Sequence, residues 1–149
     1  MTDLDKIKII GTNRKANFQY EILNRYEAGI VLLGTEVKSL RESKVNLSEA
    51  YGRFSNNELW LVGCHITEYK YGNLNNHDPI RKRKLLMNKK EIRKIKSKLE
   101  EQGLTLITTK IYFKNSRIKI ELALARGKKL FDKRESVKKR ESERKLKNY

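Results

Sequence analysis

Residues 104–125, LTLITTKIYFKNSRIKIELALA, decide the fold of this chain. Apolar side chains occupy every second position from 118 to 124, and charged side chains occupy positions 117, 119 and 121. Such alternation is typical of a strand with one buried face. The segments 104–113 and 117–125 flank Lys114-Asn115-Ser116, a turn signal. The stretch therefore predicts two antiparallel strands joined as a hairpin.

Strand signals continue upstream of this hairpin. Four further segments carry alternating or continuous apolar patterns, at 17–25, 29–34, 49–54 and 58–66. Tyr26-Glu27-Ala28 separates the first two, and Ser55-Asn56-Asn57 separates the last two. Both connections are short enough for hairpin turns. We therefore expect six antiparallel strands.

Two helices are expected between the strands. Thr35 can cap a short helix that runs through Arg41. A second helix follows Asn88, a good N-cap residue, with Glu91 at capping-box spacing. Gly103 follows its C-terminal end. The apolar stripe of this helix consists of Ile92, Ile95 and Leu99.

The order of these elements predicts a mainly β fold with flanking helices. A six-stranded antiparallel barrel of the oligonucleotide-binding (OB) type accounts for it, because closure removes exposed strand edges. An open α+β sheet fits the pattern nearly as well. Residues 67–87 match neither pattern and are expected to form a long loop.

The charge of the chain points to a polyanionic partner. Its 149 residues include 35 Lys or Arg and 18 Asp or Glu, a net charge of +17. Nucleic acid is the partner class that such an excess favours, with phosphate contacts supplying affinity. A surface selected for solubility is the alternative.

The segment 126–149 is especially basic. It contains eleven Lys or Arg and four Asp or Glu, with few large apolar residues. We expect it to be disordered when free. Its Glu and Lys residues are spaced i,i+4 in the order that favours a helix, so that a polyanionic groove could fold it. The predicted organisation is an N-terminal extension at 1–12, a barrel at 13–125 and a basic tail at 126–149.

Residues that could support catalysis or metal binding are sparse. Cys64 is alone within an apolar run and is interpreted as a small core residue. His65 and His77 are interpreted as a strand end and a turn residue, since neither has further ligands at close spacing. No glycine-rich phosphate loop is present. We therefore expect a non-enzyme without metal or cofactor. Without a signal peptide or membrane-length apolar stretch, a cytoplasmic location is expected.

The sequence offers several candidate residues for binding nucleic acid. The cluster Arg81-Lys82-Arg83-Lys84 is a candidate for phosphate contacts, although a solvated loop is the alternative. Asn13-Arg14-Lys15 could contact a phosphate or a base edge. Aromatic residues beside basic ones could stack on bases, as single-stranded or looped RNA requires; these are Tyr69, Tyr71 and Phe131. Aromatic residues within strands are interpreted as core, namely Phe18, Phe54 and Trp60.

Several segments together resemble one protein family. They are Asn13-Arg14-Lys15-Ala16, Tyr26-Glu27-Ala28-Gly29, Gly34-Thr35-Glu36-Val37-Lys38-Ser39-Leu40-Arg41, Arg83-Lys84-Leu85-Leu86-Met87-Asn88 and Gly127-Lys128-Lys129-Leu130-Phe131-Asp132-Lys133-Arg134. Their order and spacing are similar to those of small protein B (SmpB), the SsrA-binding proteins of bacteria. The segment through Ile10 lies outside the resemblance and receives no role.

The resemblance implies a six-stranded OB-like barrel that binds the tRNA-like domain of transfer-messenger RNA. It also implies that the complex, with elongation factor Tu and GTP, enters stalled ribosomes. There the tail would contact small-subunit RNA and occupy the empty mRNA channel. By similarity, the RNA face would include Asn13, Glu27, Leu86, Asn88 and Lys119. Basic residues in or beside the matched segments complete the candidate set: Arg14, Lys15, Lys38, Arg41, Arg81, Arg83 and Lys84. The ribosome-engaging tail would include Gly127, Lys128, Lys129, Phe131, Asp132, Lys133, Arg134, Lys138 and Arg140.

Two of these residues carry more specific expectations. Glu27 would be repelled by phosphates, so it is expected to accept hydrogen bonds from base amino groups or a 2′-hydroxyl and to give discrimination. Phe131 stands where many members of the family have histidine. Phe can stack but cannot titrate, and we expect Phe131→Ala to impair ribosome engagement and spare affinity for free RNA.

Two other functions remain open at this level. A basic structural protein of the ribosome has a similar composition. An RNA-acting enzyme is the third possibility, but the chain lacks an evident catalytic constellation.

Overall fold

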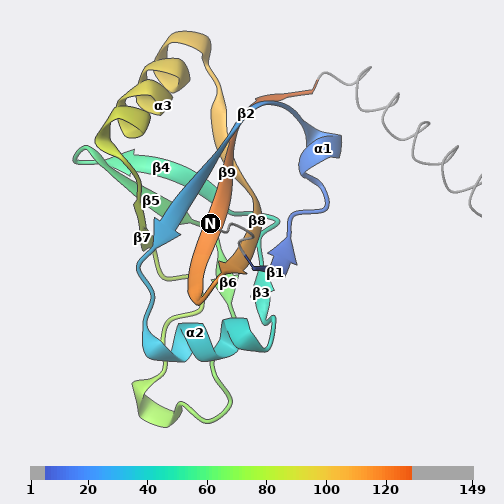
Figure 1. The fold of residues 1–149 in the computed structure, drawn as a ribbon, viewed down its shortest axis with the longest axis vertical. Helices are drawn as coiled ribbons and strands as arrows, with labels where there is room; N and C mark the ends of the chain where they lie inside the picture. The colour runs from blue at the N-terminus through green and yellow to red at the C-terminus, as the bar shows by residue number, and fades with distance from the viewer. Residues whose placement is uncertain (1–5, 129–149) are drawn as a thin grey trace, which may run out of the picture.

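The computed structural model describes residues 6–128, and the chain in this range is mainly β (Figure 1). Its strands are β1 (Ile7–Thr12), β2 (Tyr20–Ile30), β3 (Val45–Asn46), β4 (Tyr51–Ser55), β5 (Glu58–Val62), β6 (His65–Ile66), β7 (Arg83–Leu86), β8 (Thr105–Lys114) and β9 (Arg117–Gly127). Its helices are α1 (Ala16–Gln19), α2 (Gly34–Arg41), α3 (Lys89–Gln102) and the short 3₁₀ helix η1 (Asn73–Asn75).

Seven strands form one antiparallel sheet in the order β1-β8-β4-β5-β7-β2-β9. Because β9 also pairs with β8, six of them form a closed cycle of pairings, β8-β4-β5-β7-β2-β9. We call this cycle the six-strand ring. β4 and β1 pair with different parts of β8, at Ile107 and at 110–114. Strands β3 and β6 form a separate two-stranded sheet.

The main hydrophobic core contains buried residues from five strands of the ring, and Phe54 of β4, which is partly buried, packs against it. Both longer helices contribute to it, α2 through Leu40 and α3 through Ile95, and neither side chain is exposed. These helices lie at opposite ends of the ring in Figure 1. A smaller apolar cluster joins Ala16 of α1 to Ala123 and Ala125 of β9. β9 is therefore buried on both faces toward its C-terminal end.

Both short hairpins predicted by turn signals are confirmed. In the first, Ser55 pairs with Glu58 and leaves Asn56 and Asn57 as the turn. Their φ angles are 51° and 63°, as a two-residue type I′ turn requires. In the β8–β9 hairpin, Lys114 pairs with Arg117. Its turn is therefore one residue shorter than the three-residue signal suggested.

The prediction of a turn at Tyr26-Glu27-Ala28 is wrong. β2 runs without interruption from Tyr20 to Ile30, and it pairs with β9 from Tyr20↔Gly127 to Gly29↔Lys119. Pairing with the long strand β9 thus keeps residues 26–28 extended, although their local sequence resembles a turn between two strands. The expected strand start at 17 is also wrong, since α1 occupies 16–19.

Other boundaries also differ from expectation. Residues 7–12, assigned to an N-terminal extension, form β1 and pair with β8, and Ile10 is buried. Residues 83–86, assigned to a long loop, form β7 between β5 and β2. The segment 58–66 is divided into β5 and β6 at Gly63, whose φ is 77°.

The long helix agrees with its sequence signals, whereas the short one begins differently. The Asn88 side chain accepts a hydrogen bond from the Lys90 amide at 2.9 Å, and Gly103 ends α3 in the left-handed region. At α2 the N-cap is Leu33, whose amide donates to Glu36 Oε1 at 2.7 Å. Thr35 is therefore not the cap. Within residues 6–128, no helix has the length and apolar character needed to span a bilayer.

Candidate nucleic-acid interface

Strand register brings several predicted RNA-binding residues onto one outer surface of the ring. Gly29 of β2 lies opposite both Leu86 of β7 and Lys119 of β9. Lys119 in turn lies opposite Tyr112 of β8. Glu27 is two residues before Gly29 and therefore belongs to the same face of β2. We call Glu27, Leu86, Tyr112, Lys114 and Lys119 the Glu27–Lys119 surface.

Glu27 is held in place by two neighbours on β8. The Tyr112 hydroxyl donates to Glu27 Oε2 at 2.5 Å, and Lys114 Nζ donates to Oε1 at 3.1 Å. The hydrogen bond from Tyr112 is the main cause that lowers the pKa of Glu27 below its ordinary value, against the opposing effect of partial burial. The hydrogen bond from Lys114 and the charges of Lys114 and Lys119 lower it further. Glu27 is thus an ionised acceptor at neutral pH.

Gly29 leaves room for Lys119 on this surface. A Cβ atom at position 29 would lie 3.4 Å from Leu86 Cβ and 3.7 Å from Lys119 Nζ. The ammonium group therefore lies over the backbone of β2, beside Glu27. Both side chains line a groove of about 350 Å³ with Lys114, Asn115, Ser116 and Arg117.

The chemistry of this groove fits a folded RNA. Its lysine and arginine side chains can contact phosphates, while the fixed carboxylate can accept only from donors such as base amino groups or a 2′-hydroxyl. Tyr112, Lys114 and Gly29 were missed from the sequence. The alternation of Lys110, Tyr112 and Lys114 with the core residue Ile111 was the available signal. Tyr112 is itself buried and contributes its hydroxyl group to this surface.

Other predicted residues lie outside the groove. Asn13 supports the chain locally, since its Nδ2 donates to the Thr108 carbonyl at 3.2 Å and its Oδ1 accepts from the Lys15 amide at 3.3 Å. Arg14 and Lys15 are exposed beside it. Asn88 caps α3 two residues after Leu86.

The predicted residues of α2 lie at one end of the ring. Lys38 and Arg41 are exposed, and Lys38 Nζ is 5.4 Å from the centre of the Tyr69 ring. Tyr69 and Tyr71 contact each other edge to face, with ring centres 5.6 Å apart. This end thus presents cations and aromatic rings together, separate from the Glu27–Lys119 surface.

The cluster Arg81-Lys82-Arg83-Lys84 is not a uniform basic loop. Residues 83–86 form β7, so successive side chains point to opposite sides. Arg83 points inward and has no exposed surface. Its prediction as an RNA contact is therefore wrong. Lys82 is exposed, and Lys84 Nζ lies 3.5 Å from Glu58 Oε1.

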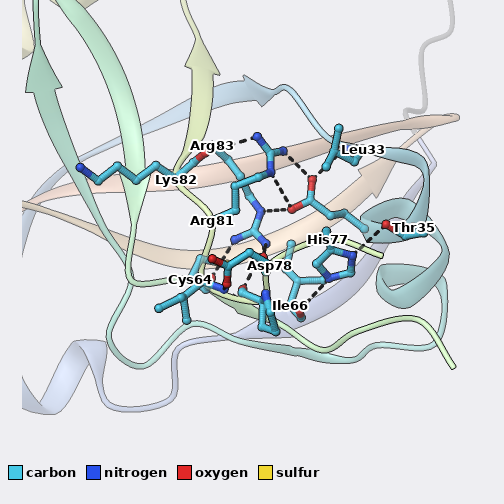
Figure 2. Close-up of polar contacts among 12 residues, drawn as sticks. Leu33, Thr35, Cys64, Ile66, His77, Asp78, Arg81, Lys82 and Arg83 are labelled. Atoms are coloured by element: carbon cyan, nitrogen blue, oxygen red, sulfur yellow. Dashed lines mark hydrogen bonds and ion pairs between the residues drawn. The ribbon is translucent and has the colours of Figure 1, made fainter. Parts of the chain in front are cut away.

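Arg83 and Arg81 both bind Glu36 of α2. Figure 2 shows the two guanidinium groups and the hydrogen bonds that they make. Arg83 Nε donates to Glu36 Oε2 at 2.5 Å, and Arg81 Nη2 donates to Oε1 at 2.6 Å. Arg83 also donates to the carbonyl of Cys64 at 2.8 Å and to that of Pro79 at 3.1 Å. This Glu36–Arg81–Arg83 network ties α2, β7 and the segment 64–79 together.

The charge of Glu36 is maintained by these donors. Burial raises its pKa, but hydrogen bonds from Arg81, the Leu33 amide and Arg83, with the charge of Arg83, lower it by more. The net pKa is below the ordinary value of 4.5. A buried ion pair with satisfied hydrogen bonds fixes geometry even where it adds little net stability.

His77, interpreted from the sequence as a turn residue, lies beside this network and is buried. Its Nε2 donates to the Ile66 carbonyl at 2.8 Å, and its Nδ1 is 2.9 Å from the Thr35 hydroxyl. Cys64 is in the core as predicted, and burial is the main cause that raises its pKa to about 11. In the part of the chain that the structure describes, no three His, Cys, Asp or Glu side chains are grouped to hold a metal.

Two residues predicted for the tail are described. Gly127 ends β9, and Lys128 Nζ donates to the Asn17 carbonyl at 2.6 Å. The remaining predicted tail residues lie outside the described residues: Lys129, Phe131, Asp132, Lys133, Arg134, Lys138 and Arg140.

Comparison with known proteins identifies the family. The sequence model of the SmpB protein family matches residues 10–149. The chain belongs to the SmpB family. It is 54% identical over 143 residues to the SsrA-binding protein of Thermosynechococcus vestitus, with 95% of this chain and 94% of that protein covered. It is 55% identical over 145 residues to the SsrA-binding protein of Thermosipho africanus, with 96% and 97% covered.

A solved structure supports the same membership of the SmpB family. One of its chains superimposes with a TM-score of 0.69 at 49% sequence identity, covering 85% of this chain and 92% of that one. It is described as "tmRNA-SmpB: a journey to the center of the bacterial ribosome". The agreement in sequence and fold therefore extends over most of the chain.

Proposed function

We propose that this chain is an RNA-binding adaptor of trans-translation. It binds the tRNA-like domain of transfer-messenger RNA and brings that RNA to stalled ribosomes. The observation that carries the proposal is the identity of 54–55% to SsrA-binding proteins over nearly the full length of both chains. The role is binding without catalysis, and the six-strand ring serves as the OB-like barrel.

The Glu27–Lys119 surface is the proposed contact with the tRNA-like domain. Glu27 discriminates among RNAs by accepting from bases or a 2′-hydroxyl, and Lys119 and Lys114 contact phosphates. Leu86 offers an apolar side chain that is half exposed beside Gly29. Asn88 adds an amide at the start of α3. Cations elsewhere on the body add nonspecific affinity; these are Arg14, Lys15, Lys38, Arg41, Arg81 and Lys84.

The basic segment after β9 is the proposed ribosome-engaging part. Its charge suits ribosomal RNA and the empty mRNA channel of the small subunit. Elongation factor Tu with GTP is the proposed companion in the delivered complex. The body of the protein is accordingly taken to include β1 and to continue through Gly127, where β9 ends.

Binding measurements with matched charge changes test the proposal. Glu27→Lys is expected to weaken binding to the tRNA-like domain at least about tenfold and to reduce preference over an ordinary tRNA, because it removes the acceptor. Glu68→Lys makes the same charge change at an exposed position. It should leave binding unchanged or slightly tighter. Equal effects of the two substitutions would contradict the assigned surface.

Truncation separates the two activities. A chain ending at Lys128 keeps every described residue. It should retain selective binding to the tRNA-like domain, with a shallower dependence on salt since fewer phosphates are contacted. It should not support tagging on stalled ribosomes. Loss of RNA selectivity on truncation would show that the segment after Lys128 contributes to selective RNA binding, contrary to the proposal.

A further inference from the structure

Trp60 lies on the outside of the ring, contrary to its interpretation as a core residue. It is the only tryptophan of the chain. Its neighbours Leu59 and Leu61 are buried in the main core. Because successive side chains of a strand point to opposite faces, Trp60 must point outward. Trp60 is neither buried nor fully exposed, so part of its surface remains accessible.

Trp60 is one of the residues that line a groove on this side of the ring. The groove has a volume of about 260 Å³ and lies over the outer faces of β4 and β5. Trp60 and Val62 supply its apolar wall, and Arg53 lies directly opposite Trp60 in the strand register. Lys82 borders the groove from the segment before β7. Ser55, Asn56 and Glu58 line it at the hairpin end.

The charges around the groove favour a ligand that carries both negative charge and hydrogen-bond donors. Arg53 and Lys82 are exposed cations, and within residues 6–128 neither forms an ion pair with an acidic side chain. The carboxylate of Glu58 is balanced by Lys84, which lies opposite Trp60 in the register of β5 and β7. The groove thus combines two cations, one aromatic face and one carboxylate, beside the polar side chains of Ser55 and Asn56.

The groove is separate from the Glu27–Lys119 surface. In the closed order β8-β4-β5-β7-β2-β9, β5 is opposite β9 and β4 is opposite β2. Glu27 and Lys119 belong to β2 and β9, whereas Arg53 and Trp60 belong to β4 and β5. A ligand on one side of the ring therefore leaves the other side accessible.

We propose that the Trp60 groove is a second RNA-binding site, for an unpaired base in a single-stranded or looped segment. The base stacks on the indole of Trp60, and Arg53 and Lys82 contact the adjoining phosphates. Glu58 accepts from an amino group on the base edge, which favours adenine, cytosine or guanine over uracil. The site extends beyond the proposed contact with the tRNA-like domain and does not depend on it.

The single tryptophan gives a local measurement. Full-length protein saturated with the tRNA-like domain is titrated with a single-stranded RNA of roughly ten nucleotides, a typical length for such sites. Stacking on Trp60 should quench its emission, and binding elsewhere should not. Oligoadenylate should quench at lower concentration than oligouridylate. The same titration without the tRNA-like domain should give a similar midpoint.

Matched variants assign the binding to the groove. Lys82→Gln and Arg53→Gln should each raise the midpoint of quenching severalfold, since each removes one phosphate contact. Lys94→Gln on α3 makes the same charge change outside the groove and should not. With labelled RNA, Trp60→Leu should weaken binding about five- to one-hundredfold and Trp60→Phe much less, because only Phe keeps a stacking face.

Four results would overturn the proposal. The first is unchanged emission in saturating oligonucleotide. The second is equal quenching by an acidic peptide, which would indicate a protein partner. The third is loss of quenching when the tRNA-like domain is bound, which would place both RNAs on one site. The fourth is an equal effect of Lys94→Gln and Lys82→Gln.

Discussion

Glu36 and Arg83 form an ion pair in which neither side chain has any exposed surface. Glu36 belongs to α2, and Arg83 is the first residue of β7. Arg81 binds the other carboxylate oxygen from a partly exposed position. The pair therefore holds a helix at one end of the ring to β7, a strand of that ring, and it leaves Arg83 dependent on a single carboxylate for charge compensation.

Removing the charge of Glu36 should destabilise the protein strongly. Glu36→Gln leaves the guanidinium of Arg83 buried without its counter-charge, a change that costs about 3–5 kcal/mol in comparable pairs. Chemical denaturation of both proteins measures the loss. Glu68→Gln at an exposed position is the control and should change stability by less than about 0.5 kcal/mol. A similar small change for Glu36→Gln would mean that Arg83 is compensated by other groups.

The same pair predicts a dependence of stability on pH. The pKa of Glu36 is lowered in the folded protein, so the unfolded chain binds a proton first as the pH falls. The contribution of Glu36 is complete above its ordinary pKa of 4.5 and is lost as the pH falls through the lower folded value. The stability difference between wild type and Glu36→Gln should accordingly shrink below about pH 4.5. A constant difference down to pH 3 would contradict the lowered pKa.

Tyr112 should act on RNA binding through Glu27. Tyr112→Phe keeps the ring but removes the hydroxyl that donates to Glu27. The carboxylate is then positioned by Lys114 alone, and affinity for the tRNA-like domain should fall about three- to tenfold, the value of one hydrogen bond. The pKa of Glu27, followed by NMR, should rise in the same variant. Tyr71→Phe, at an exposed loop position, should change neither quantity.

Asn88 should have separable roles in folding and in binding. Its side-chain oxygen caps α3, so Asn88→Ala should cost about 1 kcal/mol of stability. Asn88→Asp keeps an acceptor at the cap and should retain stability, while it removes the amide donor and adds a negative charge. If Asn88 contacts RNA, Asn88→Asp should weaken binding more than Asn88→Ala. Equal binding by both variants would limit Asn88 to its role as a cap.

Local sequence signals were sufficient to predict the β4–β5 and β8–β9 hairpins and the long helix α3. Asn56 and Asn57 tolerate positive φ angles, and Asn88 and Gly103 mark the two ends of α3. Such signals act within a few residues and are visible in the sequence. The uninterrupted course of β2 was not visible, because the strand that supports it lies far along the chain.

The errors at single residues have a related cause. Four consecutive cations at 81–84 are typical of a solvated surface, and the partner that buries Arg83 is 47 positions upstream. Trp60 lies in an apolar run, and only the paired burial of Leu59 and Leu61 shows that it faces outward. The resemblance named Glu27 and Lys119, but their joint placement with Tyr112 depends on register across three strands.

The closure of the ring also sets the order of events while the protein is being made. Tyr20 is among the first described residues to be synthesised, and its partner Gly127 is nearly the last. At a translation rate of roughly 5–20 residues per second, the interval between the synthesis of β2 and that of β9 is on the order of five to twenty seconds. The edge of β2 that pairs with β9 therefore stays unpaired in the nascent chain until residues 117–127 have been synthesised, and an unpaired strand edge is a template for pairing with other chains.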